Sequence, residues 1–187
     1  MLSSVAPIWL LSLLPTFAPA PTQTAPPASP AKLEWSAARP LTWTDFKARP
    51  NSDRLAALTS STIDAKVGCV DYQFSAQVRA VFTPSESWVR NMAQASPALL
   101  RHEQLHFDLT EIHARLLRQK LSLVKLDCEK LQPAFGNLTK MAFLTWQRDE
   151  ARYDQETNHG LNAPRQQAWD QQIQQRLTQL EAFALKQ

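Results

Sequence analysis

The segment HEQLH at residues 102–106 places two histidines four positions apart, with a glutamate directly after the first. Residues four apart lie on one face of an α-helix, so His102 and His106 can direct their imidazoles at one point. Two neutral imidazoles suit Zn²⁺, and Glu103 lies about 100° round the helix from His102. Glu103 can therefore take a proton from a bound water without coordinating the metal. The spacing predicts a zinc site with a catalytic base.

This pattern is uncommon in a chain with four histidines among 187 residues, and shuffled sequences of this composition would contain it in well under about 1% of cases. The alternative interpretation is a surface helix whose histidines and glutamate are solvated. His113 lies about 20° round the helix from His102, but about 10 Å beyond His106 along the axis. We therefore expect His113 to be a packed or cleft-lining residue and not a ligand.

A catalytic zinc needs a third protein ligand and an open fourth position. The remaining histidine, His159, stands in RYDQETNHG at the end of a predicted helix. A histidine is common at a helix C-terminus, where a cation is favoured, but here it accompanies a dense group of polar residues. We expect His159 to be the third ligand, with Asp154 or Glu156 as alternatives. Tyr153 could donate a hydrogen bond to an oxyanion, or it could be an ordinary packed tyrosine.

Two acidic residues of the same helix, Asp108 and Glu111, lie about 120–180° round the helix from His102. They point away from any metal on the first face. We expect them to be structural partners for Arg101, Arg115 or another element.

The elements that must position these residues are predicted to be helices in the second half of the chain. Ser96 followed by Pro97 is typical of a helix start, and apolar residues keep helical spacing to about residue 122. A second helix is predicted over residues 138–158, ending at Gly160, and a third over residues 164–184. The apolar residues expected to be buried in the third helix are Trp169, Ile173, Leu177 and Leu180.

The first half of the folded part has the pattern of strands. Short strand-like pieces are predicted at residues 33–35 and 41–43, and residues 56–89 contain segments in which apolar residues alternate with polar ones. The fold class expected is therefore α+β, with a small antiparallel sheet followed by three helices and a zincin-like metal helix.

Residues 1–20 carry no charged side chain and hold an apolar run of about fifteen residues, too short to span a bilayer. This run is typical of a secretory signal, although the usual lysine or arginine before it is missing. Residues 21–32 are predicted to be a proline-rich disordered spacer, and residues 33–187 a single domain. We expect a periplasmic or secreted protein without a stable membrane span.

The chain has two cysteines, Cys69 and Cys128. In an oxidising compartment they are expected to form one disulfide that closes a loop of about sixty residues, worth roughly 3–4 kcal/mol. In the cytosol, two buried thiols would be the better interpretation. The net charge of +3 is modest and the basic residues are scattered, so nothing predicts nucleic-acid binding.

Five segments of the chain match the pattern of a known family. They are LTWTDFK (41–47), SWV (87–89), LLRHEQLHFDLTEIHARLL (99–117), YDQETNHG (153–160) and RQQAWDQQI (165–173). In these segments the sequence resembles the bacterial domain of unknown function 922 family, which is described as predicted secreted Zn-dependent proteases. The resemblance implies secretion or periplasmic residence, a zinc held by His102 and His106, and Glu103 as base. It also supports His159, Asp154 and Tyr153 as site residues. Ala48 and Leu105 stand where the family usually has glycine.

The function expected from the sequence is an exported zinc metallopeptidase, with one zinc per chain and a peptide or protein substrate. Glu103 would accept a proton from the attacking water and return it to the leaving amine. A strand edge beside the metal helix could hold the substrate in extended form, although the sequence does not identify that strand. The alternatives are a periplasmic binding or scaffold protein with structural zinc or none, and a zinc amide hydrolase with a non-protein substrate.

Overall fold

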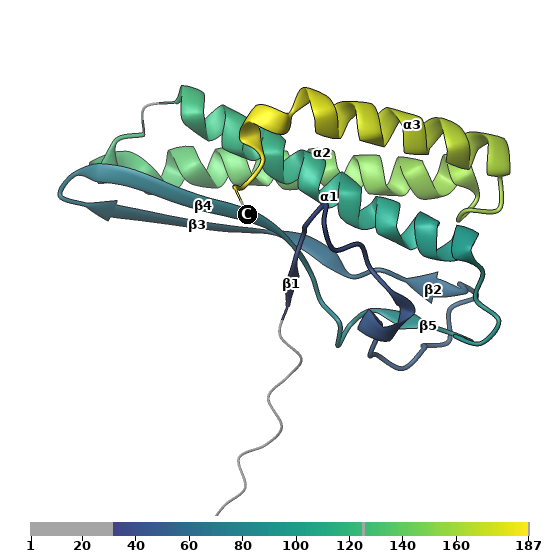
Figure 1. Ribbon diagram of the computed structural model, residues 1–187. Helices are drawn as coiled ribbons and strands as arrows, with labels where there is room; N and C mark the ends of the chain where they lie inside the picture. Colours follow the sequence, from purple (N-terminus) through teal and green to yellow (C-terminus); the bar gives the residue numbers. More distant parts are fainter. Residues whose placement is uncertain (1–31, 125, 187) are drawn as a thin grey trace, which may run out of the picture.

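The computed structural model describes residues 32–124 and 126–186 of the chain (Figure 1). The expected signal at residues 1–20 and nearly all of the expected spacer lie outside the described residues. The helices and strands follow one another in the order of an α+β fold, with a small antiparallel sheet and three helices, as predicted. In chain order they are β1 Leu33–Glu34, η1 Trp43–Asp45, β2 Ala57–Leu58, β3 Ser61–Val70, β4 Gln73–Phe82, β5 Trp88–Val89, α1 Pro97–Leu123, η2 Cys128–Lys130, α2 Leu131–Thr157, α3 Ala163–Gln179 and η3 Glu181–Phe183.

The larger sheet is a long hairpin of β3 and β4 with the short β1 added beside β4. Strands β3 and β4 pair antiparallel from Ser61 opposite Phe82 to Val70 opposite Gln73. The two residues between the strands both have positive φ, which is the backbone of the hairpin turn that matches the twist of paired strands. A second sheet consists of β2 and β5 alone, also antiparallel. The sheet predicted within residues 56–89 is confirmed.

The strand predicted at residues 41–43 is wrong, because residues 41 and 42 lie in no strand and Trp43–Asp45 form a single 3-10 turn. The backbone N–H of Thr42 donates to Asp45 Oδ2 at 2.8 Å, and the Thr42 hydroxyl donates to the same oxygen at 3.0 Å. A threonine followed three residues later by an acid satisfies the free N–H groups of a helix start. Local capping therefore overrides the apolar alternation on which the strand prediction rested.

Helix α1 is the central element of the fold, and it packs against β3, β4, α2 and α3 (Figure 1). It begins as predicted, with the Ser96 Oγ accepting a hydrogen bond from the Leu99 N–H and Pro97 in the first turn. Most side chains from His102 to Leu117 are buried, the polar ones included. A helix surrounded on several sides in this way must find a partner for each polar side chain that it carries.

Two apolar clusters hold α1 in place. One lies between α1, the β3–β4 hairpin and α2, and the other lies between α1, α2 and α3. The first contains Phe82, Phe107 and Leu117 among its most buried members. The second contains Leu105, Leu109, Ile112, Tyr153, Trp169, Ile173 and Leu177. The predicted burial of Trp169, Ile173 and Leu177 is thus confirmed, and Leu180 packs partly buried against the same cluster.

Helix α2 begins at Leu131, seven residues before the predicted start. Gly136 and Asn137 favour a later start, because both are weak helix formers. Burial of Phe135 against the first cluster stabilises these two additional turns and outweighs the cost of the two residues, roughly 1 kcal/mol for glycine and less for asparagine. Helix α3 ends earlier than predicted, at Gln179, and the chain continues as the short turn η3. Within the described ranges, no helix is long and apolar enough to cross a membrane.

Glu111 and Asp108, two buried acidic residues of α1, are paired with arginines, as the sequence predicts. Arg115 Nε lies 2.8 Å from Glu111 Oε1, and Arg101 Nη1 lies 3.6 Å from Asp108 Oδ2. Asp108 also accepts a hydrogen bond from the Trp35 indole N–H at 2.8 Å. Within residues 32–124 and 126–186, every buried side-chain nitrogen or oxygen has a hydrogen-bond partner.

One further polar cluster links all three helices. His113 of α1 and Arg176 of α3 both contact Asp149 of α2, with their nitrogens 2.9 and 3.0 Å from Asp149 Oδ2. His113 is therefore a packed residue, as expected from its distance along the helix. The hydrogen bond from His113 holds the pKa of Asp149 below its usual value, against the effect of burial. The cluster fixes how α2 is aligned with α1 and α3.

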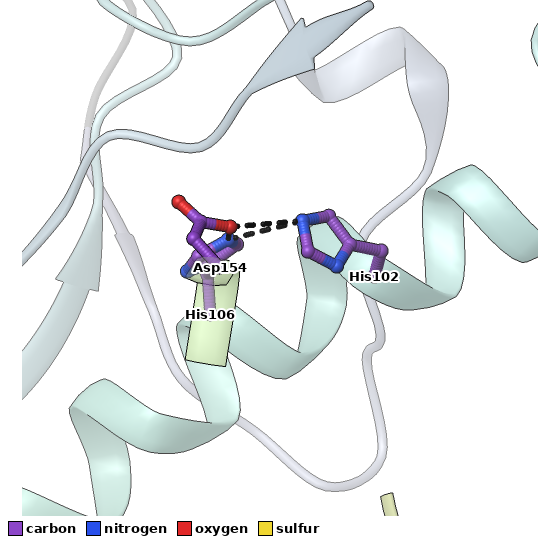
Figure 2. A group of neighbouring side chains, drawn as sticks. All are labelled: His102, His106 and Asp154. Atoms are coloured by element: carbon purple, nitrogen blue, oxygen red, sulfur yellow. Dashed lines mark hydrogen bonds and ion pairs between the residues drawn. The ribbon is translucent and has the colours of Figure 1, made fainter. Parts of the chain in front are cut away.

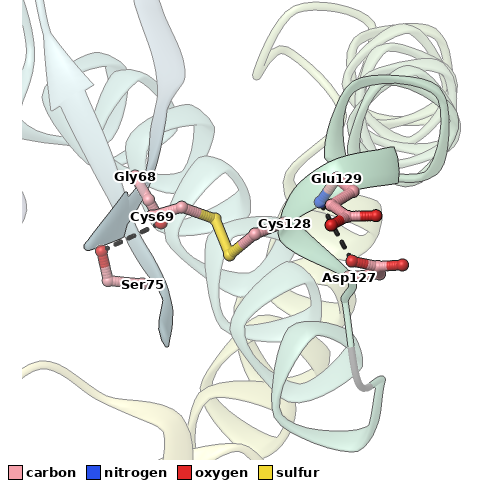
Figure 3. The surroundings of a disulfide bond; sticks show 6 residues. All are labelled: Gly68, Cys69, Ser75, Asp127, Cys128 and Glu129. Carbon is pink, nitrogen blue, oxygen red and sulfur yellow. Dashed lines mark hydrogen bonds between the residues drawn. A yellow bond between two sulfur atoms is a disulfide. The ribbon is translucent and has the colours of Figure 1, made fainter. Parts of the chain in front are cut away.

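Cys69 of β3 and Cys128 of η2 form the predicted disulfide (Figure 3). It joins the far part of the hairpin to the segment that leads into α2. The bond spans 59 positions of sequence, and the loop that it closes contains β4, β5 and the whole of α1.

Replacing Cys69 and Cys128 together by serine should lower the free energy of unfolding by about 4 kcal/mol, the value that the chain-entropy model gives for a loop of this length. Urea unfolding followed by circular dichroism, with and without reductant, measures this difference. The reduced parent is the control and should match the double variant. A loss below about 1 kcal/mol in both would contradict the expectation.

The Asp149→Asn substitution should cost about 1–3 kcal/mol of stability near pH 7, because His113 and Arg176 lose their carboxylate partner. The pKa of Asp149 is depressed in the folded state, so its contribution is present above the unfolded pKa and disappears as pH falls through the folded value. The gap between parent and variant should therefore shrink below about pH 4. Urea titrations at several pH values measure it, and Asp64→Asn, at a half-exposed surface pair, should change little at any pH.

Candidate metal centre

Three side chains from two helices converge at one point (Figure 2). His102 and His106 come from α1, and Asp154 comes from the last turns of α2. The two Nε2 atoms lie 3.2 and 3.1 Å from Asp154 Oδ1, and 3.3 Å from each other. These donor atoms form a triangle with nearly equal sides. In the described part of the chain, this is the group of histidine and acidic side chains that could hold a metal ion.

The other nitrogen of each ring contacts an acceptor that fixes the orientation of the ring. His102 Nδ1 lies 3.1 Å from Gln166 Oε1 of α3, and His106 Nδ1 contacts Glu150 Oε2 of α2. The second oxygen of Glu150 accepts a hydrogen bond from the Trp146 indole at 2.9 Å. Because amide and carboxylate oxygens only accept, each Nδ1 carries the hydrogen, and in the neutral ring each Nε2 therefore presents a lone pair. Such outer partners commonly orient metal-ligating histidines.

The triangle therefore consists of two nitrogen lone pairs and a carboxylate oxygen, which repel one another unless a cation lies among them. The pKa values point the same way. Burial lowers the pKa of His106, but the carboxylates of Glu150 and Asp154 outweigh it and raise the pKa well above its usual value. Burial raises the pKa of Asp154, yet hydrogen bonds to both histidines hold it well below its usual range. The site stabilises positive charge, supplied by a metal ion or a proton.

Tyr153 is fully buried and packs against both imidazole rings of the site. Its ring stacks on His102 with centroids 4.8 Å apart and meets His106 edge-on at the same distance. Its hydroxyl accepts from Gln166 Nε2 at 2.7 Å and has the His102 carbonyl oxygen 3.3 Å away. The hydroxyl thus lies on the side away from the converging donors. Of the two roles that the sequence left open for Tyr153, this placement favours the packed tyrosine, which orients His102, while the role of oxyanion donor stays a prediction.

The structure places the remaining candidates outside the triangle. His159, the expected third ligand, is half exposed, and its Nδ1 lies 3.4 Å from Asp154 Oδ1. It is held there by a run of positive φ at Asn158, His159 and Gly160. Gly160 packs on the ring of His102, where an added Cβ would come within 3.1 Å of Cγ.

Asp154, named from the sequence as an alternative to His159, occupies the third corner of the triangle. Glu156, the other alternative, faces away from it. Its carboxylate accepts hydrogen bonds from Arg152 and from the Trp169 indole, both at distances of 2.8–2.9 Å. Whether His159 also binds a metal stays a prediction, but its position is at the rim.

Glu103 is buried next to the triangle, and the Thr59 hydroxyl donates to its Oε2 at 2.7 Å. A cavity of about 410 Å³ brings Glu103 together with His102, His106 and Asp154. Its other wall is the segment from Leu55 to Ser61, which includes β2. Leu105, one of the departures from the family pattern, points into the core and not into this cavity.

Sequence reasoning missed Glu150 and Gln166, which orient the two histidines. Glu150 stands four residues before Asp154 on α2, so helical spacing alone puts the two carboxylates on one face. That signal could have been used. Gln166 had no comparable signal, because it lies among several glutamines in a polar helix.

A family model described as bacterial protein of unknown function (DUF922) matches residues 37–160, which is more than half of the 187-residue chain. The chain therefore belongs to this family. The match includes α1, α2 and His159 and ends before α3, so Gln166 lies beyond it. No curated protein and no solved structure matches the chain.

Asp154→Ala should weaken zinc binding by at least about 100-fold, because it removes one of three converging donors. His159→Ala should weaken zinc binding by less than about 10-fold, since the triangle remains. Glu156→Ala, two positions from Asp154 but turned away, is the matched control and should bind zinc as the parent does. Competition with a chromophoric chelator measures all three affinities. If His159→Ala loses zinc as completely as Asp154→Ala, His159 is a ligand, as the sequence suggested.

Proposed function

We propose that this member of the DUF922 family is a zinc-dependent metallopeptidase with His102, His106 and Asp154 as metal ligands and Glu103 as general base. The observation that carries the proposal is the convergence of three donor atoms at a cavity that also contains a buried glutamate. Zinc bound by such a set lowers the pKa of a coordinated water and polarises a carbonyl group.

The donor set suits zinc in chemistry and in spacing. Two imidazole nitrogens and one carboxylate oxygen form a common ligand set of catalytic zinc sites. Ligand atoms about 2.0–2.1 Å from a tetrahedral zinc lie about 3.3 Å from one another. The three separations found here, 3.1, 3.2 and 3.3 Å, are close to that value. If the site held only a shared proton, Asp154 Oδ1 would not need to lie at nearly the same distance from both Nε2 atoms.

Glu103 has the placement of a base that does not coordinate. Its Oε2 is engaged by the Thr59 hydroxyl, which leaves Oε1 as the atom that can accept a proton. Burial beside the cavity keeps bulk water from competing for that position. In the proposed reaction, Glu103 takes the proton from the attacking water and passes it to the nitrogen of the leaving amine.

The cavity favours a catalytic site over a structural one. Structural zinc sites are closed by four protein ligands, whereas catalytic sites keep one position open. The triangle provides three ligands, and a space of about 410 Å³ adjoins it. A scaffold or binding protein would have no use for a buried carboxylate next to the metal. A zinc hydrolase acting on a non-protein amide would use the same metal chemistry and is separated from a peptidase by its substrates.

We also propose that the protein acts in an oxidising compartment, in the periplasm or outside the cell. The Cys69–Cys128 disulfide supports this proposal, because such bonds form and persist where thiols are not kept reduced. The apolar run within residues 1–20 is the second support.

Glu103→Gln should lower the hydrolysis rate by about 10²–10⁴-fold, because the amide cannot accept a proton, while zinc still binds one per chain. Cleavage of a fluorogenic casein conjugate and zinc analysis of the same samples measure both properties. Glu129→Gln makes the same chemical change at an exposed site on η2 and should leave both unchanged. Full activity in zinc-loaded Glu103→Gln would falsify the assignment of the base. Zinc binding without any hydrolysis by the parent would favour a binding protein.

A further inference from the structure

Strand β2 has a free edge beside the candidate metal centre. It pairs with β5 alone, with Ala57 opposite Val89 and Leu58 opposite Trp88. One residue earlier, the Arg90 N–H donates to the Ala56 carbonyl at 2.8 Å. Residues of an antiparallel strand alternate between those that bond their partner and those that do not. Ala57 is therefore a non-bonded position, and its N–H and C=O are directed away from β5.

These two backbone groups of Ala57 are in need of a partner. Ala57 is only 5% exposed, and buried backbone groups are almost always hydrogen-bonded. Outside the strand ladders, no hydrogen bond in the described part of the chain involves Ala57. The cavity lies on the side of β2 away from β5, because residues 55–61 line it and no residue of β5 does. An extended chain entering the cavity could supply both missing partners.

The charges of the cavity restrict which part of a polypeptide can enter. Its described lining contains the carboxylates of Glu103, Glu150 and Asp154 and no lysine or arginine. A C-terminal carboxylate would find no lysine or arginine to pair with there, and the proposed zinc is reserved for the carbonyl and the attacking water. A terminal amine would have to compete for carboxylates that are already engaged by Thr59, by the histidines and by Trp146. Neither end of a chain is recognised by such a lining.

We propose, building on the metallopeptidase function, that the site binds an internal segment of a polypeptide in extended conformation, added as a strand to β2 at Ala57. The substrate class is then an unfolded or flexible chain cut within its length. Compact amides and chain termini are excluded. Acidic side chains close to the bond that is cut should disfavour binding, because the cavity already carries three carboxylates.

The first measurement is the pattern of cuts that the zinc-loaded parent makes in unfolded casein, read by mass spectrometry. Internal cuts are expected, with few acidic residues next to them. Removal of single residues from either end would overturn the inference but leave the peptidase function intact. No cleavage by protein that holds one zinc per chain would overturn both.

The second measurement is independent of catalysis. A ten-residue peptide that spans one internal casein cut, with blocked ends and a fluorescein label, is bound to zinc-loaded Glu103→Gln protein and followed by fluorescence anisotropy. The peptide is then N-methylated at one residue at a time. Because only the peptide residue opposite Ala57 exchanges hydrogen bonds with β2, affinity should fall by about 3–10-fold when that residue is methylated and change little at the residues on either side of it. Equal tolerance at all positions would overturn the proposal.

A variant of the protein tests the same contact from the other side. Ala57→Pro in the Glu103→Gln background removes the N–H that faces the cavity and leaves the bonds between β2 and β5, and proline is tolerated at the first residue of a strand. The variant should bind the peptide about 3–10-fold more weakly than its parent. It should also abolish the effect of methylation at the peptide residue that faces position 57. Zinc content and circular dichroism establish that the variant is folded. If it is not folded, the methylated peptides decide the question alone.

Discussion

The burial of α1 is the constraint on which the rest of the structure depends. This helix contacts the hairpin and both other helices, so its polar side chains cannot rely on water. Each must meet a partner within the fold, because an unpaired buried group costs roughly 1–3 kcal/mol. Glu111 is met by arginines of α1 itself, Asp108 by Trp35, and His113 by Asp149 of α2. Arg115 in turn donates to the Leu177 carbonyl of α3. The positions of the segment after β1, of α2 and of α3 around α1 are thereby specified by hydrogen bonds as well as by apolar packing.

At the candidate metal centre, the pairing of buried polar groups brings like-charged atoms together. His102 and His106 are buried like their neighbours, and their Nδ1 atoms are satisfied by Gln166 and Glu150. Their Nε2 atoms face each other and a carboxylate, an arrangement that is favourable only around positive charge. Tyr153 fills the space behind both rings, so the rings cannot turn away from one another. The same packing that stabilises the core therefore holds the three side chains in a geometry suited to a cation.

Much of this arrangement could be predicted from the sequence, and the part that could not has a physical reason. The start and length of α1, the hairpin, the disulfide and the facing of His102 and His106 follow from local signals such as capping, alternation and helical spacing. The third corner of the triangle depends on how α2 is rotated against α1, which is set by tertiary packing. The sequence therefore favoured His159 over Asp154. The sequence also left the role of Tyr153 open, because burial decides whether its hydroxyl is available to a substrate.

The position of Asp154, and not His159, at the third corner of the triangle follows from helix geometry. Asp154 and Glu150 are four residues apart on α2, so they lie on one face, as His102 and His106 do on α1. One carboxylate can then enter the triangle while the other supports the ring of His106 from behind. A rotation of α2 by one residue would move both carboxylates by about 100° and leave two imidazoles without a counter-charge. Asp149, adjacent to Glu150, contacts α1 and α3 together and opposes that rotation.

His159 lies beyond the end of the helix on backbone with positive φ, so nothing comparable fixes its ring. The site thus depends on how α1 and α2 are aligned with each other. The ion-paired cluster of His113, Asp149 and Arg176 contributes to that alignment without touching the site.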